Sequence, residues 1–326
     1  MAKKNNFSKK TDNKKTDNKK TDNKKNIIII TCAIISISVL SLIFAMNSET
    51  SVTLPETSVT LPETSGMMSD YIKNLSNTNP HNVFLDVDYF DTYFTDEDFT
   101  RIQNNLEYPI DALKITLSES TAEQLIDILK PNDGTVVIYP TFTSIAYHEP
   151  GFYTYFRGDC DESCIIDVPL VNPEFKYTSS GLTAQILYHV GYDFLTDIQV
   201  DQNPELLQNY DTVILLHNEY VTKKAFDAIS SHPNLIFLFP NALYAEIDVN
   251  YDDNTMTLIR GHQYPPPENP DNGFDYDIEI EFHHYEYDTE CLEWEFIEFE
   301  NGHHLNCYPD GVIYFNLEIL LKMKEL

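Results

Sequence analysis

The sequence predicts an α/β protein whose parallel sheet core is followed by a β-rich antiparallel C-terminal part and preceded by a single transmembrane helix. Residues 27–46 form an uncharged apolar run long enough to cross a bilayer. Short apolar runs alternate with helical segments between residues 111 and 239, which is typical of βαβ units. After residue 245 the apolar residues recur at every second position, as in half-exposed antiparallel strands.

The basic N-terminal tail predicts how the chain is oriented in the membrane. Residues 1–26 hold ten lysines and three aspartates, and the positive-inside rule keeps such a tail in the cytoplasm. We therefore expect a single-pass protein of the cell membrane, held in the lipid bilayer by residues 27–46, with the remaining chain extracytoplasmic. A cleaved signal peptide is the alternative, but its apolar region would span only about 7–15 residues. The longer run favours an uncleaved signal anchor.

Residues 47–67 are expected to form an extended stalk. The heptapeptide SVTLPET occurs twice there, and Ser/Thr/Pro-rich repeats cannot build a core. LPETS resembles the LPxTG sorting signal of sortase substrates, but Ser65 stands where that signal needs glycine. Asn74 begins an Asn-Leu-Ser sequon and is the candidate N-glycosylation site.

The part of the chain that follows the tail is strongly acidic. The net charge is −31 for the whole chain and +7 for residues 1–25, so residues 26–326 carry −38. This charge excludes nucleic acid as a partner, because phosphate groups are bound by lysine and arginine. Solubility in a salty exterior explains it, and concentration of cations is the functional alternative.

From residue 68 the composition becomes that of a folded domain. We expect an N-terminal α/β extension at 68–130, the parallel core at 131–246 and the β-rich part at 247–326. Strands are predicted at 111–117, 135–139, 193–198, 212–217, 235–239, 246–251, 255–260, 277–282 and 292–296. Helices are predicted at 121–129 after a Ser120 cap, at 181–190, at 204–209, and from a Thr222 cap to about residue 231.

Four cysteines follow the membrane span. Their even number in an oxidising compartment predicts two disulfides, with three possible pairings. We favour Cys160–Cys164 and Cys291–Cys307. A metal site is the alternative, but there is no CxxC pair. A two-residue turn at Asn301-Gly302 would place Cys307 opposite Phe296, so the second bridge needs a bend or another register.

Polar residues follow several predicted core strands. Ligands of open α/β sheets bind outside the carboxyl ends of the strands. One strand is followed by His217-Asn218-Glu219 and another leads into a loop that contains Tyr147, Tyr153 and Tyr155. His217 and Glu219 are therefore candidates for a metal-binding or acid–base pair. In the competing interpretation His217 only ends a strand and Glu219 only starts a helix, whose dipole favours a carboxylate there.

These residues carry a resemblance. The segment 135–246, roughly a third of the chain, resembles the class I amidotransferase-like domain of the dimethylformamidase large chain, which implies a flavodoxin-like sheet. The domain as a whole also resembles membrane-anchored archaeal proteins. The matching pieces are Pro140-Thr141 with Ala146-Tyr147, Thr196-Asp197, His217-x-Glu219-Tyr220 and Asn241-x-x-Tyr244.

The resemblance implies a mononuclear iron site. In that family two tyrosines and a glutamate hold the iron, with a histidine nearby. Glu219 matches the glutamate, His217 the histidine and Tyr147 one tyrosine, with Tyr155 preferred to Tyr153 as the second. Phenolate and carboxylate oxygens are hard donors that suit ferric iron. The chain departs from the family in having Phe239-Pro240 in place of a glycine pair, and no cysteine lies at a strand-to-helix elbow.

The sequence therefore leaves open what the external domain does. The leading interpretation is an amidohydrolase-like domain that hydrolyses a small amide. The alternative is a non-catalytic cell-surface module that binds a ligand or partner on a degenerate amidotransferase-like fold. A structural role with a cell-envelope partner is a third interpretation.

Overall fold

The computed structural model describes residues 81–83, 89–104, 109–172, 175–274 and 291–326. The predicted tail, membrane span and stalk, the sequon at Asn74 and the strand expected at 277–282 lie outside these ranges. Within the described ranges, no helix has both the length and the apolar character that crossing a bilayer requires. The described residues all belong to one compact unit, Val59–Leu326.

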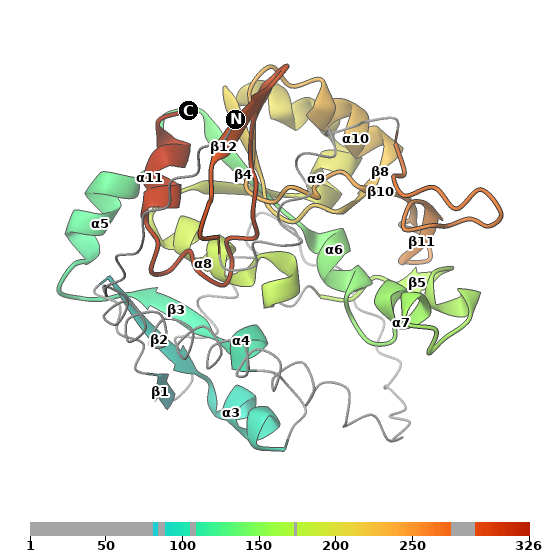
Figure 1. The fold of residues 1–326 in the computed structure, drawn as a ribbon, viewed down its shortest axis with the longest axis horizontal. Helices are drawn as coiled ribbons and strands as arrows, with labels where there is room; N and C mark the ends of the chain where they lie inside the picture. Colours follow the sequence, from blue (N-terminus) through green and yellow to red (C-terminus); the bar gives the residue numbers. More distant parts are fainter. Residues whose placement is uncertain (1–80, 84–88, 105–108, 173–174, 275–290) are drawn as a thin grey trace, which may run out of the picture. The chain divides into compact units, whose positions relative to one another are not determined.

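A six-stranded sheet forms the centre of this unit (Figure 1). Its strands follow the order β12-β13-β9-β7-β4-β6, and all neighbours are parallel except β12 and β13. Their bounds are Thr135–Tyr139 for β4, Asp193–Thr196 for β6, Thr212–Leu215 for β7, Leu235–Phe237 for β9, Phe296–Phe299 for β12 and Gly302–Leu305 for β13. Numbered along the chain, the five parallel strands lie in the order 2-1-3-4-5, which is that of flavodoxin-type sheets. The expected parallel core is confirmed.

The composition of β4 explains why it lies at the centre of the sheet. All five residues are buried, and its β-branched side chains suit a strand that is covered on both faces. Val137 and Tyr139 pack in one core cluster, and Val136 and Ile138 pack in another. Alternate residues therefore face opposite layers of the protein.

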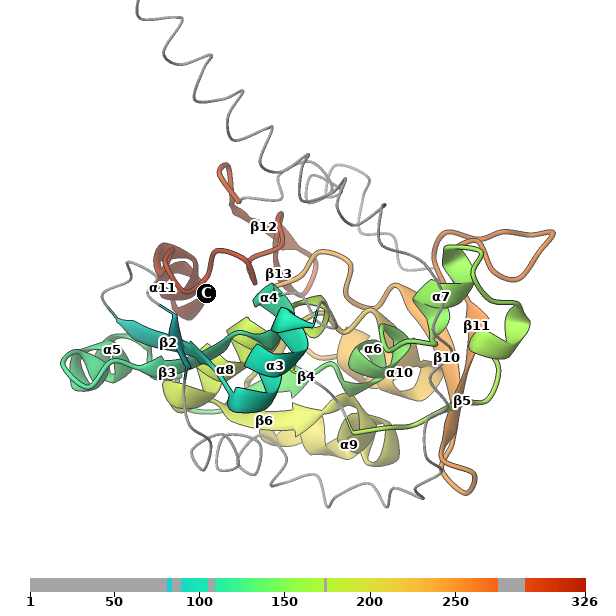
Figure 2. The same ribbon diagram turned by 90° about the horizontal axis from the view of Figure 1, so that it is seen from below.

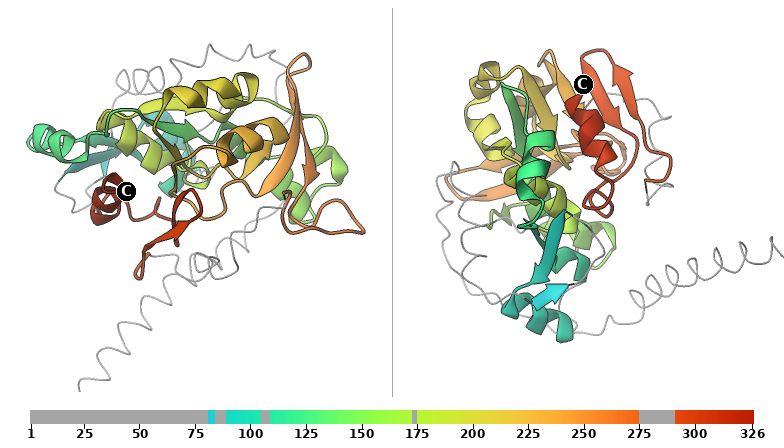
Figure 3. Two further views of the ribbon diagram at one scale, coloured as in Figure 1. Left: turned by 90° about the horizontal axis from the view of Figure 1, so that it is seen from above. Right: turned by 90° about the vertical axis from the view of Figure 1, so that its left-hand side faces the viewer.

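Helices cover both faces of the central sheet (Figures 2 and 3). One core cluster is shared by α5 (Ala122–Leu129), α8 (Gly181–His189) and the C-terminal α11 (Glu318–Lys324). The opposite cluster is shared by the 3₁₀ helix η4 (Pro204–Asn209) and α10 (Lys223–Ser230). Thr222 caps α10 as predicted, because its hydroxyl accepts a hydrogen bond of 3.1 Å from the amide of Ala225.

A second, four-stranded sheet contains β8, the strand that follows β7 along the chain. Its order is β5-β11-β10-β8, with bounds Val168–Pro169, Thr255–Arg260, Ala245–Asn250 and Tyr220–Thr222. β10 and β11 form the predicted antiparallel hairpin, whose turn includes Asn254 at φ 54°. In Figures 1 and 2 this hairpin lies beside the short helix α7 (Phe152–Phe156). Residues 216–219 therefore run between the two sheets.

The N-terminal described region forms a small antiparallel sheet. It consists of β1 (His81–Val83), β2 (Phe90–Phe94) and β3 (Lys114–Leu117). Helix α3 (Asp96–Gln103) has a capping box between Thr95 and Asp98. The amide of Ile115 donates to the side chain of Gln185 over 3.0 Å, which fastens β3 to α8.

Several local expectations need correction. The strand predicted at 111–117 begins at Lys114, because the turn of helix α4 (Pro109–Ala112) precedes it. Thr121, not Ser120, occupies the N-cap of α5. The strand predicted at 193–198 ends at Thr196, whose hydroxyl caps α9 (Asp197–Gln202).

The expected β-rich part at 247–326 is divided between two sheets, because β11 lies in the four-stranded sheet and β13 lies in the central one. β13 pairs in parallel with β9, so the β12–β13 hairpin extends the central sheet. The strand expected at 292–296 begins only at Phe296, and α11 follows where further β structure was expected. Parallel pairing joins segments far apart in the chain, and the local alternation of apolar residues cannot indicate it.

Both favoured disulfides are present, Cys160–Cys164 and Cys291–Cys307. The β12–β13 hairpin pairs Phe299 with Gly302. Phe296 therefore faces Leu305, whereas the expected turn placed it opposite Cys307. Cys291 also has a left-handed backbone, with φ 47°, and this bends the chain before β12. Paired cysteines are typical of proteins outside the cytoplasm.

Candidate functional site

The candidate site lies at the point where the winding of the central sheet reverses. β4 and β7 are neighbours, and the chain continues from β4 to β6 on one side and from β7 to β9 on the other. Doubly wound sheets bind ligands outside the carboxyl ends of their strands at this point. The end of β4 leads through α6 (Thr141–Ala146) to Tyr147, and β7 leads to His217 and Glu219.

Glu219 is the buried centre of the site, with 1% of its surface exposed. Its amide donates to the hydroxyl of Thr143 over 3.0 Å. Its carbonyl oxygen accepts from the amides of Tyr244 and Ala245 over 2.9 and 2.8 Å. Because hydrogen bonds hold the backbone on both sides, the carboxylate has a fixed position between the two sheets.

Two tyrosines lead from the half-exposed rim of the site to this carboxylate. The hydroxyl of Tyr153, on α7, donates to Oε1 of Glu219 over 3.2 Å. The hydroxyl of Tyr147 donates to that of Tyr153 over 2.6 Å, and the two rings stack with centroids 3.9 Å apart. Tyr155 packs instead against Phe156 and Tyr264. The structure thus joins Tyr153, rather than Tyr155, to Tyr147 and Glu219.

His217 contacts the carboxylate from the β7 side, and its ring is fixed by its other nitrogen. Nδ1 lies 2.7 Å from the carbonyl oxygen of Thr178, which can only accept, so Nδ1 carries a proton. Nε2 lies 3.3 Å from Oε2 of Glu219 and 2.8 Å from Nδ2 of Asn241. Only 3% of His217 is exposed.

His262 completes the site, and the sequence analysis missed it. Its Nε2 lies 2.6 Å from Oε1 of Glu219, and its side chain is 21% exposed. The residue follows β11 in the second sheet, far along the chain from the other site residues. The only local signal is its place between Gly261 and a proline-rich loop, and such a signal names no partner.

The electrostatics of the site favour an ionised glutamate. Burial alone would raise the pKa of Glu219, but the charge of His262 and the close contacts of the two imidazoles with the carboxylate outweigh it. The pKa of this carboxyl therefore lies well below its ordinary range. Burial and the nearby Glu219 charge raise the pKa values of Tyr147 and Tyr153, so both are neutral phenols while no cation is bound.

The spacing of the oxygen atoms suits a hard cation. The hydroxyls of Tyr147 and Tyr153 are 2.6 Å apart, and Tyr153 lies 3.2 and 3.5 Å from the two oxygens of Glu219. Two ligands each about 2 Å from one ion have similar separations. Across the described ranges, no three His, Cys, Asp or Glu side chains form a metal-binding group. An ion at this site would therefore require the tyrosine oxygens.

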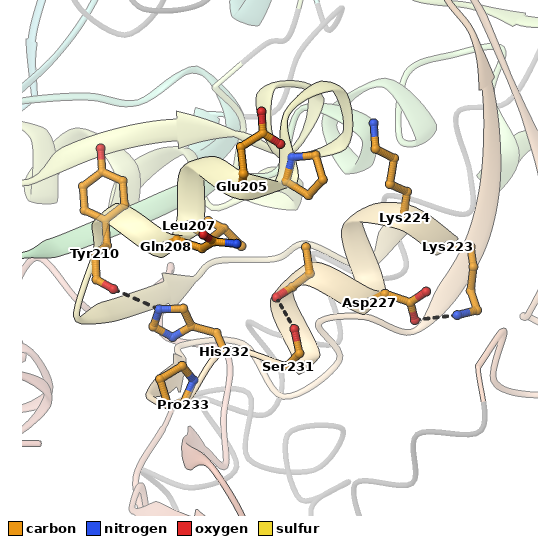
Figure 4. A pocket seen from close by; sticks show the side chains of 12 residues that line it. Glu205, Leu207, Gln208, Tyr210, Lys223, Lys224, Asp227, Ser231, His232 and Pro233 are labelled. Carbon is orange, nitrogen blue, oxygen red and sulfur yellow. Dashed lines mark hydrogen bonds and ion pairs between the residues drawn. The ribbon is translucent and has the colours of Figure 1, made fainter.

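A separate groove of about 950 Å³ lies between η4 and α10 (Figure 4). Its lining shares no residue with the Glu219 site. The ammonium group of Lys223 is paired with Asp227, and the ring of His232 contacts the carbonyl oxygen of Tyr210. These groups are engaged within the protein, so we place the candidate site at Glu219.

No protein-family model matches this chain, and no curated protein matches it in sequence.

Proposed function

We propose that the folded domain is an extracytoplasmic, metal-dependent amidohydrolase that acts on a small amide at Glu219. The observation that supports this most strongly is the convergence of Tyr153, His217 and His262 on one buried carboxylate, to which Tyr147 is joined through the hydroxyl of Tyr153. Its place at the switch point of a 2-1-3-4-5 sheet agrees with the expected amidotransferase-like fold. The left-handed backbone of His262, with φ 52°, also favours a functional site.

Glu219, Tyr147 and Tyr153 would hold the ion, and ferric iron is the ion that their hard oxygens favour. The bound ion would polarise the amide carbonyl and acidify a water molecule. A cation also reverses the local electrostatics, because it favours the phenolate forms that the protein alone disfavours.

His217 in its neutral form has the arrangement of a general base. Its Nε2 then accepts a hydrogen bond from Asn241, and an attacking water would take the place of that amide before the proton moves. After Nε2 takes a proton from the attacking water, Glu219 Oε2 lies 3.3 Å away to stabilise the imidazolium. The Thr178 carbonyl keeps the ring in the same orientation throughout the transfer. The proton is then available to the leaving nitrogen.

The second candidate function is a non-catalytic binding module. The burial of Glu219 favours it, since the carboxylate lies within a connected network of two tyrosines and two histidines. In this interpretation the network stabilises the region between the sheets, and a ligand binds at its rim.

Hydrolysis of small amides by the purified full-length chain, loaded with ferric iron, tests the proposal. We expect release of amine from at least one simple amide, loss of this activity in Glu219→Gln, and retention of activity in the control His232→Ala. An inactive wild-type chain that binds iron would favour the binding module.

We further propose that the chain is anchored in the cell membrane by residues 27–46, with the folded domain extracytoplasmic. The two disulfides support an oxidising location for that domain. Protease added to intact cells should remove the domain and spare the lysine-rich tail. Protection of the domain would overturn this orientation.

A further inference from the structure

The turn Gly261–Tyr264 presents His262 in an unfavourable backbone conformation. Reciprocal backbone hydrogen bonds of 3.0 Å between Gly261 and Tyr264 close the turn. Its two central residues, His262 and Gln263, have φ values of 52° and 62°. Such turns strongly prefer Asn and Gly at these positions. Strained residues of this kind cluster at functional sites, where the surrounding structure holds them.

The surroundings hold this turn firmly. The amide of His262 donates to the carbonyl oxygen of Asp271 over 2.9 Å, and that of Gln263 donates to Pro270 over 2.8 Å. A Cβ on Gly261 would lie 2.9 Å from the Cβ of Ala245, so the turn packs directly on β10. The imidazole of His262 therefore has a fixed place beside Glu219.

Aromatic rings fix the imidazole and continue outward from it. The His262 ring lies 4.7 Å from Tyr244, 5.5 Å from Tyr220 and 5.0 Å from Phe156, between ring centroids. Phe156 in turn contacts Tyr155 at 5.5 Å, and Tyr155 meets Tyr264 edge-on at 6.2 Å. The rings of Phe156, Tyr155 and Tyr264 are half-buried, so they present apolar surface next to the site.

The charges near these rings disfavour an anionic ligand. Arg157 follows Phe156, but its guanidinium is bound to Glu149 over 2.6 Å and to Asp159 over 3.1 Å. Glu162 lies close enough to Tyr264 to raise the pKa of its phenol, although burial contributes more. At the Tyr155–Tyr264 end of this row of rings, a ligand carboxylate would therefore meet acidic groups and a guanidinium that is already paired.

From these observations we propose that His262, Tyr155 and Tyr264 form a recognition wall that selects neutral amides carrying a flat apolar substituent. The His262 imidazole contacts the amide group beside Glu219, and the Tyr155–Tyr264 pair receives the substituent. This assignment rests on the proposed amidohydrolase function, although the wall itself is tested by binding as well as by turnover.

The kinetic test compares acetamide with acetanilide, which differ by a phenyl group. In the full-length, iron-loaded chain, Tyr155→Ala should raise KM for acetanilide about tenfold more than it raises KM for acetamide, as expected for one lost aromatic contact. Tyr155→Phe should restore the wild-type KM. Tyr188 lies on α8 outside the site, and Tyr188→Ala should leave KM unchanged for both substrates. His262→Gln should lower kcat/KM for both amides.

An equal rise in KM for both amides in Tyr155→Ala, or no rise for either, would overturn the proposed recognition wall. Saturation-transfer NMR of acetanilide with the wild-type chain and Tyr155→Ala gives a readout that needs no turnover. Binding by the wild type without hydrolysis, weakened in Tyr155→Ala, would refute the amidohydrolase proposal and support the wall. Absence of both binding and hydrolysis in the wild type would refute the wall as well.

Discussion

The hydroxyl of Tyr153 lies 3.2 Å from Oε1 of Glu219, although the two residues are 66 positions apart in the sequence. The contact links α7, which follows β4, to the segment that follows β7. It makes the chain Tyr147–Tyr153–Glu219 a continuous row of oxygen atoms at the edge of the central sheet. This relationship distinguishes the two tyrosines that the sequence offered as the second ligand.

The first prediction separates Tyr153 from Tyr155. Tyr153→Phe should weaken ferric iron binding by about tenfold or more, because it removes an oxygen next to Glu219. A tenfold change corresponds to roughly 1.4 kcal/mol of binding free energy. Tyr155→Phe should leave the affinity unchanged, since that ring packs against Phe156 and Tyr264. Competition with a chromophoric chelator measures both affinities. A larger loss in Tyr155→Phe would reverse the assignment.

The second prediction concerns the pH dependence that Glu219 gives to stability. Its pKa is lowered in the folded state, so its ionised form stabilises the fold above the unfolded pKa of about 4.3. This contribution is lost as pH falls through the folded-state pKa. The difference in unfolding free energy between wild type and Glu219→Gln should therefore shrink from pH 6 to pH 3 in urea titrations. A difference that grows on acidification would contradict the low pKa.

Asp310 should have the opposite dependence. Burial raises its pKa to about 6, although its carboxylate accepts hydrogen bonds from Thr183 and Leu182. The pKa of Asp310 in the unfolded chain is about 3.9, so the shift corresponds to about 3 kcal/mol of unfolding free energy that depends on pH. The stabilisation is complete below the unfolded pKa and is lost as pH rises through 6. The excess stability of wild type over Asp310→Asn should fall from pH 4 to pH 7. An excess that stays constant would refute the raised pKa.

The disulfides should differ in what they contribute. Cys291–Cys307 closes a longer loop than Cys160–Cys164, with sequence separations of 16 and 4. Loop-closure entropy gives about 3 kcal/mol for the first and about 2 kcal/mol for the second. Unfolding of Cys307→Ser and Cys160→Ser, each with its partner also replaced, measures the two losses. Thiol labelling of the denatured, non-reduced wild type should find Cys160, Cys164, Cys291 and Cys307 all oxidised, and labelling of these four residues would contradict the pairing.

The parallel core could be predicted because the residues of each strand indicate by themselves whether the strand is buried. Residues 136–139 form an apolar run after Thr135, which indicates a strand covered on both faces, and all five residues of β4 are buried. The polar residues after β7 could also be assigned, because ligands bind at the carboxyl ends of such strands. His217 and Glu219 are only two positions apart, so their proximity needed no tertiary information.

The remaining parts of the site depend on tertiary structure. Tyr153 and Tyr155 lie in a helix of five residues, where positions two apart point in different directions. Which of them faced Glu219 depended on where that helix begins. His262 reaches the site from a turn in the second sheet, and β13 joins β9 across more than sixty residues. Neither contact leaves a periodic signal in the sequence.

Iron content together with the absorption spectrum of the purified full-length chain is the most direct test of a metal site at Glu219. We predict that ferric iron binds in a one-to-one ratio and produces a phenolate-to-iron charge-transfer band. Glu219→Gln and Tyr153→Phe should each weaken the band, while far-UV circular dichroism stays as in the wild type. A wild-type chain that remains colourless with excess ferric iron, or a band that persists unchanged in both variants, would contradict a metal site at Glu219.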